Sequence, residues 1–237
     1  MNEHDGLAAW LRLTLIPGIG GETQRKLLAA FGSPAAVFAA GPVATRTIAA
    51  SRADLLFDTD NRAAIDNALA WAEQPGNHIL PLDHPDYPPD LLQIADPPNL
   101  LYVKGDPSLL RRRALAVVGS RNATPQGMQT AEAFAKALAV QGLCIVSGLA
   151  LGIDAAAHRG ALAANGATVA IIGTGADRIY RPATASWRWP SPSAAPSFPN
   201  FRSAHRCWRL TFRGATASFP GWHRVYWWLK QRRKAAR

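Results

Sequence analysis

The middle of the chain contains three short apolar runs, at residues 115–118, 143–146 and 168–172. Each run is too short for a helix, contains β-branched residues and is followed by Gly or Ser-Gly. Between the runs, residues 125–140 and 153–164 place apolar side chains at helical spacing. Because buried strands alternate with helices in this pattern, it predicts a βαβαβ unit with parallel strands.

The chain before this unit has a helical pattern. Residues 7–40 show helical spacing, broken by the sequence Pro-Gly-Ile-Gly at 17–20, and shorter helices and then short strands are expected to follow. The fold class is therefore α/β, with a small helical domain at residues 1–75 that is SAM-like or helix-hairpin-helix-like. A Rossmann-like domain with an incomplete parallel sheet is expected at residues 76–182.

The βαβαβ unit should carry a binding site at one edge of its sheet, because right-handed crossovers place all βα turns at the carboxyl ends of the strands. Glycines let backbone N–H groups approach an anion, and the helix that follows each turn adds partial positive charge. We therefore predict a phosphate-binding site formed by three turns: Gly119, Ser120 and Arg121; Ser147, Gly148, Ala150, Gly152, Ile153 and Asp154; and Gly173, Thr174 and Gly175.

The first turn argues against a dinucleotide. It reads Gly-Ser-Arg-Asn-Ala-Thr instead of G-x-G-x-x-G, and Arg121 fills space that a pyrophosphate would need. A guanidinium in a glycine turn favours a phosphodiester held from outside, through bidentate contacts and backbone amides.

Three segments together resemble the family of the DNA-processing protein DprA (Smf): VVGSRNATPQG at 117–127, IVSGLALGIDAAAHRGAL at 145–162 and IIGTGADRIY at 171–180. The resemblance implies an extended Rossmann domain that binds single-stranded DNA and loads the RecA recombinase during natural transformation. It also implies a homodimer, with no catalytic residue, cofactor or metal.

The glycine-containing break at 16–21 resembles the hairpin of a helix-hairpin-helix motif, whose amides contact a DNA phosphate. Its candidate DNA contacts are Gly18, Gly20, Arg25 and Lys26. The alternative is a tight turn between two helices that packs and binds nothing. The sequence leaves both interpretations open.

Asp154 and His158 stand four residues apart on one predicted helix face, where a carboxylate and an imidazole could share a proton. No nucleophile, third group or metal ligand accompanies them, so we expect Asp154 to hydrogen-bond the loop at the start of its helix. The protein is then a DNA-binding protein and not an enzyme. The alternative is a nucleoside-monophosphate phosphoribohydrolase-like enzyme of the related Rossmann family, although the PGGxGTxxE signature of those enzymes does not occur.

Three consecutive arginines at 111–113 precede the first strand of the unit. Basic residues at the end of a helix complement its dipole, so a solvated helix end is the expected role. Their position beside the Rossmann strand also leaves a minor DNA contact open.

The excess positive charge of the chain, +10 in total with a pI near 10.4, is confined to its end. Residues 1–180 carry a net charge of −2, whereas residues 181–237 carry +12, contain no Asp or Glu, and hold six of the eight Trp. A basic nucleic-acid arm in which Arg and Trp stack on bases is one explanation of this composition.

A frameshift after Tyr180 is the explanation we favour. Codons for residues 180–187 can be chosen so that one restored base yields YPASDSEL, and the same shift recovers segments such as FPRRNRI and VVEAAAKSGS that resemble missing DprA motifs. We therefore expect residues 183–237 to be an out-of-frame, disordered basic tail, and the truncated protein to be inactive or impaired.

The first residues are polar and acidic, and no apolar run approaches the ~20 residues of a membrane span. A cytoplasmic protein is therefore expected. Cys144 and Cys207 form neither a disulfide framework nor a metal-binding spacing.

Overall fold

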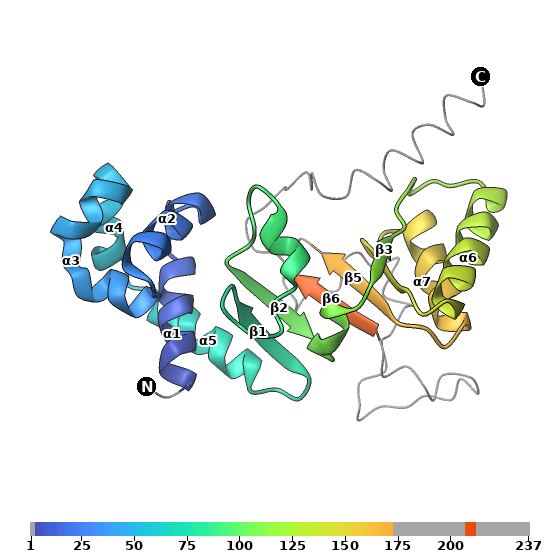
Figure 1. Cartoon of the computed structure of the whole chain (residues 1–237), viewed down its shortest axis with the longest axis horizontal. Coiled ribbons are helices and arrows are strands. Elements are labelled where there is room, and N and C mark those ends of the chain that lie inside the picture. The colour runs from blue at the N-terminus through green and yellow to red at the C-terminus, as the bar shows by residue number, and fades with distance from the viewer. Residues whose placement is uncertain (1–2, 173–206, 212–237) are drawn as a thin grey trace, which may run out of the picture. The chain divides into compact units, whose positions relative to one another are not determined.

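The computed structural model describes residues 3–172 and 207–211 (Figure 1). The chain divides into two compact units, Met1–Leu101 and Tyr102–Arg237. Each unit carries its own group of predicted site residues.

The first unit is mainly helical, as the hydrophobic pattern predicted. Ser33 starts the third helix by accepting a hydrogen bond on Oγ from the Ala36 N–H at 3.2 Å, and Gly41 interrupts that helix with a φ of 78°. The elements are α1 (Glu3–Thr14), α2 (Gly21–Phe31), α3 (Pro34–Ala49), η1 (Ala50–Arg52), α4 (Ala53–Asp58), α5 (Arg62–Ala72), β1 (Asn77–Pro81) and η2 (Pro89–Gln93).

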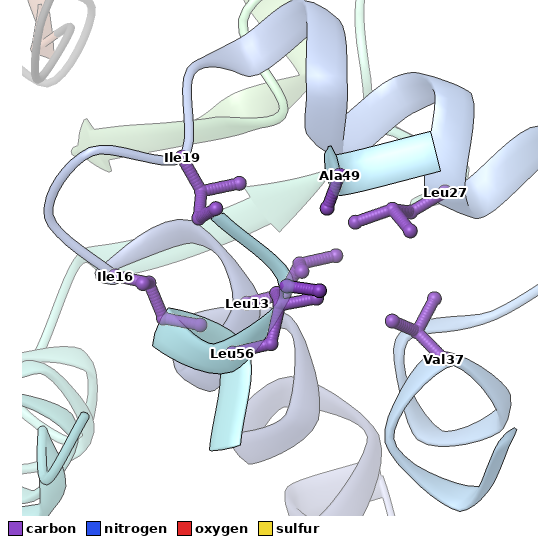
Figure 2. Close-up of a cluster of buried hydrophobic side chains, with 8 residues drawn as sticks. Leu13, Ile16, Ile19, Leu27, Val37, Ala49 and Leu56 are labelled. Carbon is purple, nitrogen blue, oxygen red and sulfur yellow. The ribbon is translucent and has the colours of Figure 1, made fainter. Parts of the chain in front are cut away.

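Aliphatic side chains from α1, α2, α3 and α4 form the core of the helical part (Figure 2). Each fully buried Leu, Ile or Val contributes roughly 1.5–3 kcal/mol relative to an exposed one. Ile16 and Ile19 bracket the Pro17-Gly18 turn and point into this core, so the hairpin is held by packing on both sides. The core residues are Leu13, Ile16, Ile19, Leu27, Val37, Ala49, Ala53 and Leu56.

In its described residues, the second unit combines a mainly parallel sheet with the helices α6 and α7, which confirms the predicted α/β fold class. Its strand order is β2-β6-β5-β4-β3; β3, β4, β5 and β6 run parallel, and β2 pairs antiparallel with β6. The elements are β2 (Leu100–Lys104), η3 (Pro107–Arg111), β3 (Ala114–Ala116), α6 (Pro125–Val140), β4 (Cys144–Ser147), α7 (Ile153–Ala163), β5 (Thr168–Ile172) and β6 (Cys207–Thr211).

Helices α6 and α7 lie side by side (Figure 1) and approach closely at Gly160. A Cβ on Gly160 would lie 2.1 Å from the Glu132 carbonyl oxygen, so only glycine fits there. Arg159 on α7 reaches Glu132 on α6, with 2.9 Å between Nε and Oε2. The close contact fixes α7, and with it the turn before α7, relative to α6.

The structure describes five residues of the expected basic tail. Residues 183–237 were expected to be disordered, but Cys207–Thr211 forms β6, which pairs with β5 and β2. The open edge of β5 explains this pairing, because unpaired strand edges recruit any segment that tolerates an extended conformation. The other residues of the expected tail lie outside the described residues.

No single helix in the described part of the chain is long and apolar enough to cross a membrane. Among the described residues, α2 and the segment Pro34–Asp58 together reach the required length and composition, but the two are bent by 93° relative to each other.

Candidate functional site

The first two predicted turns lie against each other, as their placement after parallel strands required. The Ile153 N–H donates a hydrogen bond to the Ser120 carbonyl at 3.2 Å. Gly152 has a φ of 80°, and a Cβ there would lie 2.2 Å from the same carbonyl oxygen. The turn 119–122 is therefore supported by the start of α7.

Asp154 joins the two turns from inside. Its Oδ1 accepts a hydrogen bond from the Gly119 N–H at 3.3 Å, and its Oδ2 accepts from the N–H groups of Gly148 at 3.2 Å and Ala150 at 3.4 Å. The side chain is buried, and burial raises the pKa of the Asp154 carboxyl, while the amide hydrogen bonds act in the opposite direction. Asp154 thus binds the loops at the start of its helix.

This geometry changes what the glycine turns can offer to a ligand. The sequence pattern assigned Gly119, Gly148 and Ala150 to phosphate, but their N–H groups donate to Asp154 in the structure. A phosphate could bind these three amides only by displacing a buried carboxylate. The internal carboxylate therefore favours contacts from the outer side of the first turn.

The outer side of the first turn carries Ser120 and Arg121, both exposed. The Ser120 Oγ accepts a hydrogen bond from the Asn122 N–H at 3.2 Å, which shapes the turn. Within the described residues, no hydrogen bond or ion pair engages the Arg121 side chain. Its guanidinium can therefore reach an external phosphate without breaking another contact.

Thr124 begins α6 beside this turn, and its Oγ1 accepts a hydrogen bond from the Gly127 N–H at 3.1 Å.

The third predicted turn, at Gly173, Thr174 and Gly175, lies outside the described residues.

His158 does not pair with Asp154. Its Nδ1 lies 2.7 Å from Thr168 Oγ1, and the Thr168 hydroxyl donates to the Ile145 carbonyl at 2.7 Å. Since the hydroxyl proton is used, Nδ1 carries the imidazole proton and donates to Thr168. His158 is buried, and Nε2 has no hydrogen-bond partner among the described residues. A proton shared between Asp154 and His158 is therefore not part of this site.

Acidification should destabilise the protein through His158. Burial lowers its pKa from 6.5 to about 4, so the neutral ring stabilises the fold above pH 6.5 and this contribution is lost as the pH falls toward 4. The loss corresponds to about 3 kcal/mol in the free energy of unfolding. Denaturant unfolding at pH 7 and pH 4, followed by circular dichroism, measures it.

His158→Gln is the control for this prediction, because glutamine is neutral at both pH values. Between pH 7 and pH 4, the unmodified chain should lose about 3 kcal/mol more than the variant. Asp154 titrates in the opposite direction, and the comparison removes it because both proteins contain it. Equal losses in the two proteins would show that His158 is already protonated or hydrated in the fold.

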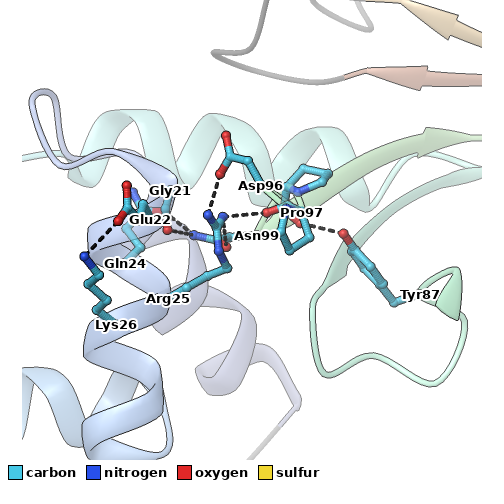
Figure 3. Close-up of polar contacts among 10 residues, drawn as sticks. Gly21, Glu22, Gln24, Arg25, Lys26, Tyr87, Asp96, Pro97 and Asn99 are labelled. Carbon is cyan, nitrogen blue, oxygen red and sulfur yellow. Dashed lines mark hydrogen bonds and ion pairs between the residues drawn. The ribbon is translucent and has the colours of Figure 1, made fainter. Parts of the chain in front are cut away.

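The N-terminal candidates Arg25 and Lys26 are engaged within the first unit (Figure 3). The Arg25 guanidinium pairs with Asp96 and donates to the Pro97 carbonyl at 2.7 Å, while Lys26 pairs with Glu22 at 2.8 Å. Buried Gln24 accepts a hydrogen bond from the Asn99 side chain at 2.6 Å. The contacts of Arg25 and Gln24 attach α2 to residues 96–99. No sequence pattern predicted this link.

The hairpin glycines differ from each other. Gly18 has a φ of 85°, and a Cβ there would lie 3.3 Å from the Leu55 Cδ1. Gly20 has an ordinary extended conformation with a φ of −73°, and a Cβ there would meet nothing within 4 Å.

The first unit also holds twelve Asp and Glu against six Lys and Arg, a net charge of −6. That charge disfavours DNA binding.

Replacing Gly20 with glutamate tests whether the hairpin contacts DNA. We expect the affinity of the full chain for single-stranded DNA to change by less than about twofold, because the neighbouring cations are already paired. Gly20→Gln is the size-matched control, and fluorescence anisotropy gives both affinities. A clear loss with Glu but not with Gln would assign Gly18, Gly20, Arg25 and Lys26 to a DNA contact.

Within the described residues, no three His, Cys, Asp or Glu side chains gather as metal ligands would.

Known proteins are similar to this chain in sequence and in fold. The family model described as DNA recombination-mediator protein A matches residues 78–189. Protein Smf of Escherichia coli (strain K12) is 43% identical over 119 residues, which are 50% of this chain and 32% of that protein. Protein Smf of Synechocystis sp. is 33% identical over 184 residues, 74% of this chain and 46% of that protein. The chain therefore spans less than half the length of these relatives.

A solved structure is also similar. The X-ray structure of DNA processing protein A (DprA) from Streptococcus pneumoniae superposes with a TM-score of 0.65 at 26% sequence identity. The superposition covers 89% of this chain and 67% of the S. pneumoniae chain.

Proposed function

Because this chain belongs to the DNA recombination-mediator protein A (DprA/Smf) family, we propose that it binds single-stranded DNA, with Arg121 holding a backbone phosphate. The observation that carries the proposal is an exposed guanidinium, with no hydrogen-bond or ion-pair partner among the described residues, on a turn whose inner side is closed by Asp154. Arginine binds a phosphodiester through two parallel hydrogen bonds, and such contacts do not depend on the base sequence. Arg121 is then positioned by Gly119 and Ser120 of its own turn and by the start of α7, which packs against that turn.

Single-stranded DNA fits this site better than a free nucleotide. A nucleotide needs bare amides for its phosphate, and the amides of Gly119, Gly148 and Ala150 already donate to Asp154. A phosphodiester that approaches from outside needs only Arg121 and the outer amides of the turn. The protein would then act by binding DNA, without catalysis.

A titration with single-stranded and duplex oligonucleotides of the same length tests this function. We expect tighter binding of the single strand at every salt concentration, because splayed bases leave the backbone free to enter the turn. Equal affinity for both forms would indicate non-specific attraction by the twelve Lys and Arg of residues 181–237. Incubation with AMP or CMP should release no base; release would support a phosphoribohydrolase.

We also propose that loading of RecA and formation of a homodimer, which the family resemblance implies, are impaired in this chain by a frameshift after Tyr180. The proposal is supported by the charge difference between residues 1–180 and 181–237. The nucleotide sequence around the Tyr180 codon is the test. Codons that yield no DprA-like amino-acid sequence after insertion of one base would refute the frameshift.

A further inference from the structure

Arg111, Arg112 and Arg113 form a basic cluster that the proposed site does not use. All three side chains are exposed, and they stand between η3 and β3. Residues 102–172 hold seven Lys and Arg against three Asp and Glu, a net charge of +4, in contrast to −6 for the first unit. The cluster therefore supplies much of the positive charge on the described part of the second unit.

A helix-capping role does not account for the cluster. The preceding η3 is a five-residue 3-10 helix that ends at Arg111, so its dipole is small. Arg112 is already extended, with a φ of −75° and a ψ of 151°. Arg112 and Arg113 thus belong to the extended chain that leads into β3.

The local contacts of Arg112 and Arg113 leave their charges uncompensated. Arg112 Nη2 donates to the Gly142 carbonyl at 3.3 Å, in the turn between α6 and β4, and the Arg113 carbonyl accepts from the Cys144 N–H at 2.9 Å. No carboxylate pairs with either side chain among the described residues. The Arg112 guanidinium is therefore held by a neutral backbone partner, and the backbone of Arg113 is fixed beside β4.

That place lies at the opposite end of β3 from Arg121. Arg113 immediately precedes β3, and Arg121 lies in the turn after it, with the seven residues 114–120 between the two arginines. The six steps from Arg113 to Gly119, where the turn begins, span roughly 20 Å when extended. Strand β3 stands at the end of the strand order, so no further strand covers it among the described residues. The two basic points therefore flank one edge of the sheet.

We propose that Arg112 and Arg113, with Arg111 beside them, form a second contact for the backbone of the same DNA single strand that binds at Arg121. This inference rests on the proposed function. The strand would follow the edge at β3, with one phosphate held at the turn and others at the arginine cluster. Guanidinium groups suit this role because they bind phosphate oxygens in any sequence context.

The experiment compares short and long oligonucleotides on the full chain. A single strand of about four nucleotides should reach only Arg121, whereas one of about sixteen should reach both contacts. The variant Arg112→Gln/Arg113→Gln should bind the long strand roughly three- to tenfold more weakly, with its salt dependence reduced by about 1.4 in log–log slope. The short strand should bind it as before.

Lys136→Gln is the matched control, because Lys136 is exposed on α6 and carries the same charge. Equal effects of the control and the double variant on the long strand, or an equal loss for both strands, would overturn the second contact. If Arg121→Ala weakens both strands and the double variant weakens neither, only the second contact is wrong. If Arg121→Ala leaves both affinities unchanged while the double variant weakens binding of the long strand, the arginine cluster binds DNA and the proposed phosphate site at Arg121 is wrong.

Discussion

Replacing Arg121 with alanine should weaken binding of single-stranded DNA to the full chain by roughly ten- to a hundredfold. A hydrogen-bonded contact between charged groups contributes about 1.5–3 kcal/mol, and alanine removes both the charge and the fork of donors. Loss of one phosphate contact should also lower the log–log salt slope by about 0.7. Anisotropy titrations at several salt concentrations give the affinity and the slope.

The Arg121 side chain is exposed, and no hydrogen bond or ion pair engages it within the described residues, so its removal should leave the fold intact. Circular dichroism and the unfolding midpoint check this. Lys136→Ala is the control for a general loss of charge, and residues 181–237 contribute equally to every variant. An unchanged affinity and salt slope for Arg121→Ala would remove Arg121 from the site.

Gly152→Ala should be the most destabilising substitution in the turns. A Cβ at this position would lie 2.2 Å from the Ser120 carbonyl oxygen and 2.7 Å from the Arg121 carbonyl oxygen. Overpacking costs about 1–3 kcal/mol, and a left-handed backbone costs a residue with a Cβ a further ~1–2 kcal/mol. We therefore expect the free energy of unfolding to fall by about 2–5 kcal/mol in denaturant titrations.

Gly142→Ala separates the two contributions. Gly142 has a φ of 82°, nearly that of Gly152, but a Cβ there meets nothing within 4 Å. Its alanine variant should lose only the ~1–2 kcal/mol of backbone strain. If Gly152→Ala is no worse than Gly142→Ala, the first turn does not rest on the start of α7, and the support proposed for Arg121 is wrong.

Local signals in the sequence were sufficient for the βαβαβ elements of the second unit. Pro125–Val140 and Thr168–Ile172 occur as helix and strand with the predicted bounds. Thr124 and Pro125 start α6 as expected, because a Thr N-cap and a Pro at the first helical position act within one turn of the chain. Parallel pairing of β3, β4 and β5 follows from the crossover helices between them. Such features depend on neighbouring residues, and a single sequence contains them.

Long-range contacts escaped prediction for a different reason. The strand at Cys207–Thr211 depends on open edges formed by β2 and β5, which are far away in sequence. The link between Arg25 and residues 96–99 likewise joins positions more than 70 residues apart.

Short motifs in the sequence are enough to show its resemblance to the DprA/Smf family, and hydrophobic periodicity is enough to predict the α/β class, because both signals lie in neighbouring residues. A phosphate site at the turns stays a prediction. Which backbone amides remain for a ligand was settled only in three dimensions. Asp154 fills the inner side of two turns, and Gly152 brings those turns within contact distance. Hydrogen-bond donors can be counted in a sequence, but whether they are already satisfied depends on how distant segments pack.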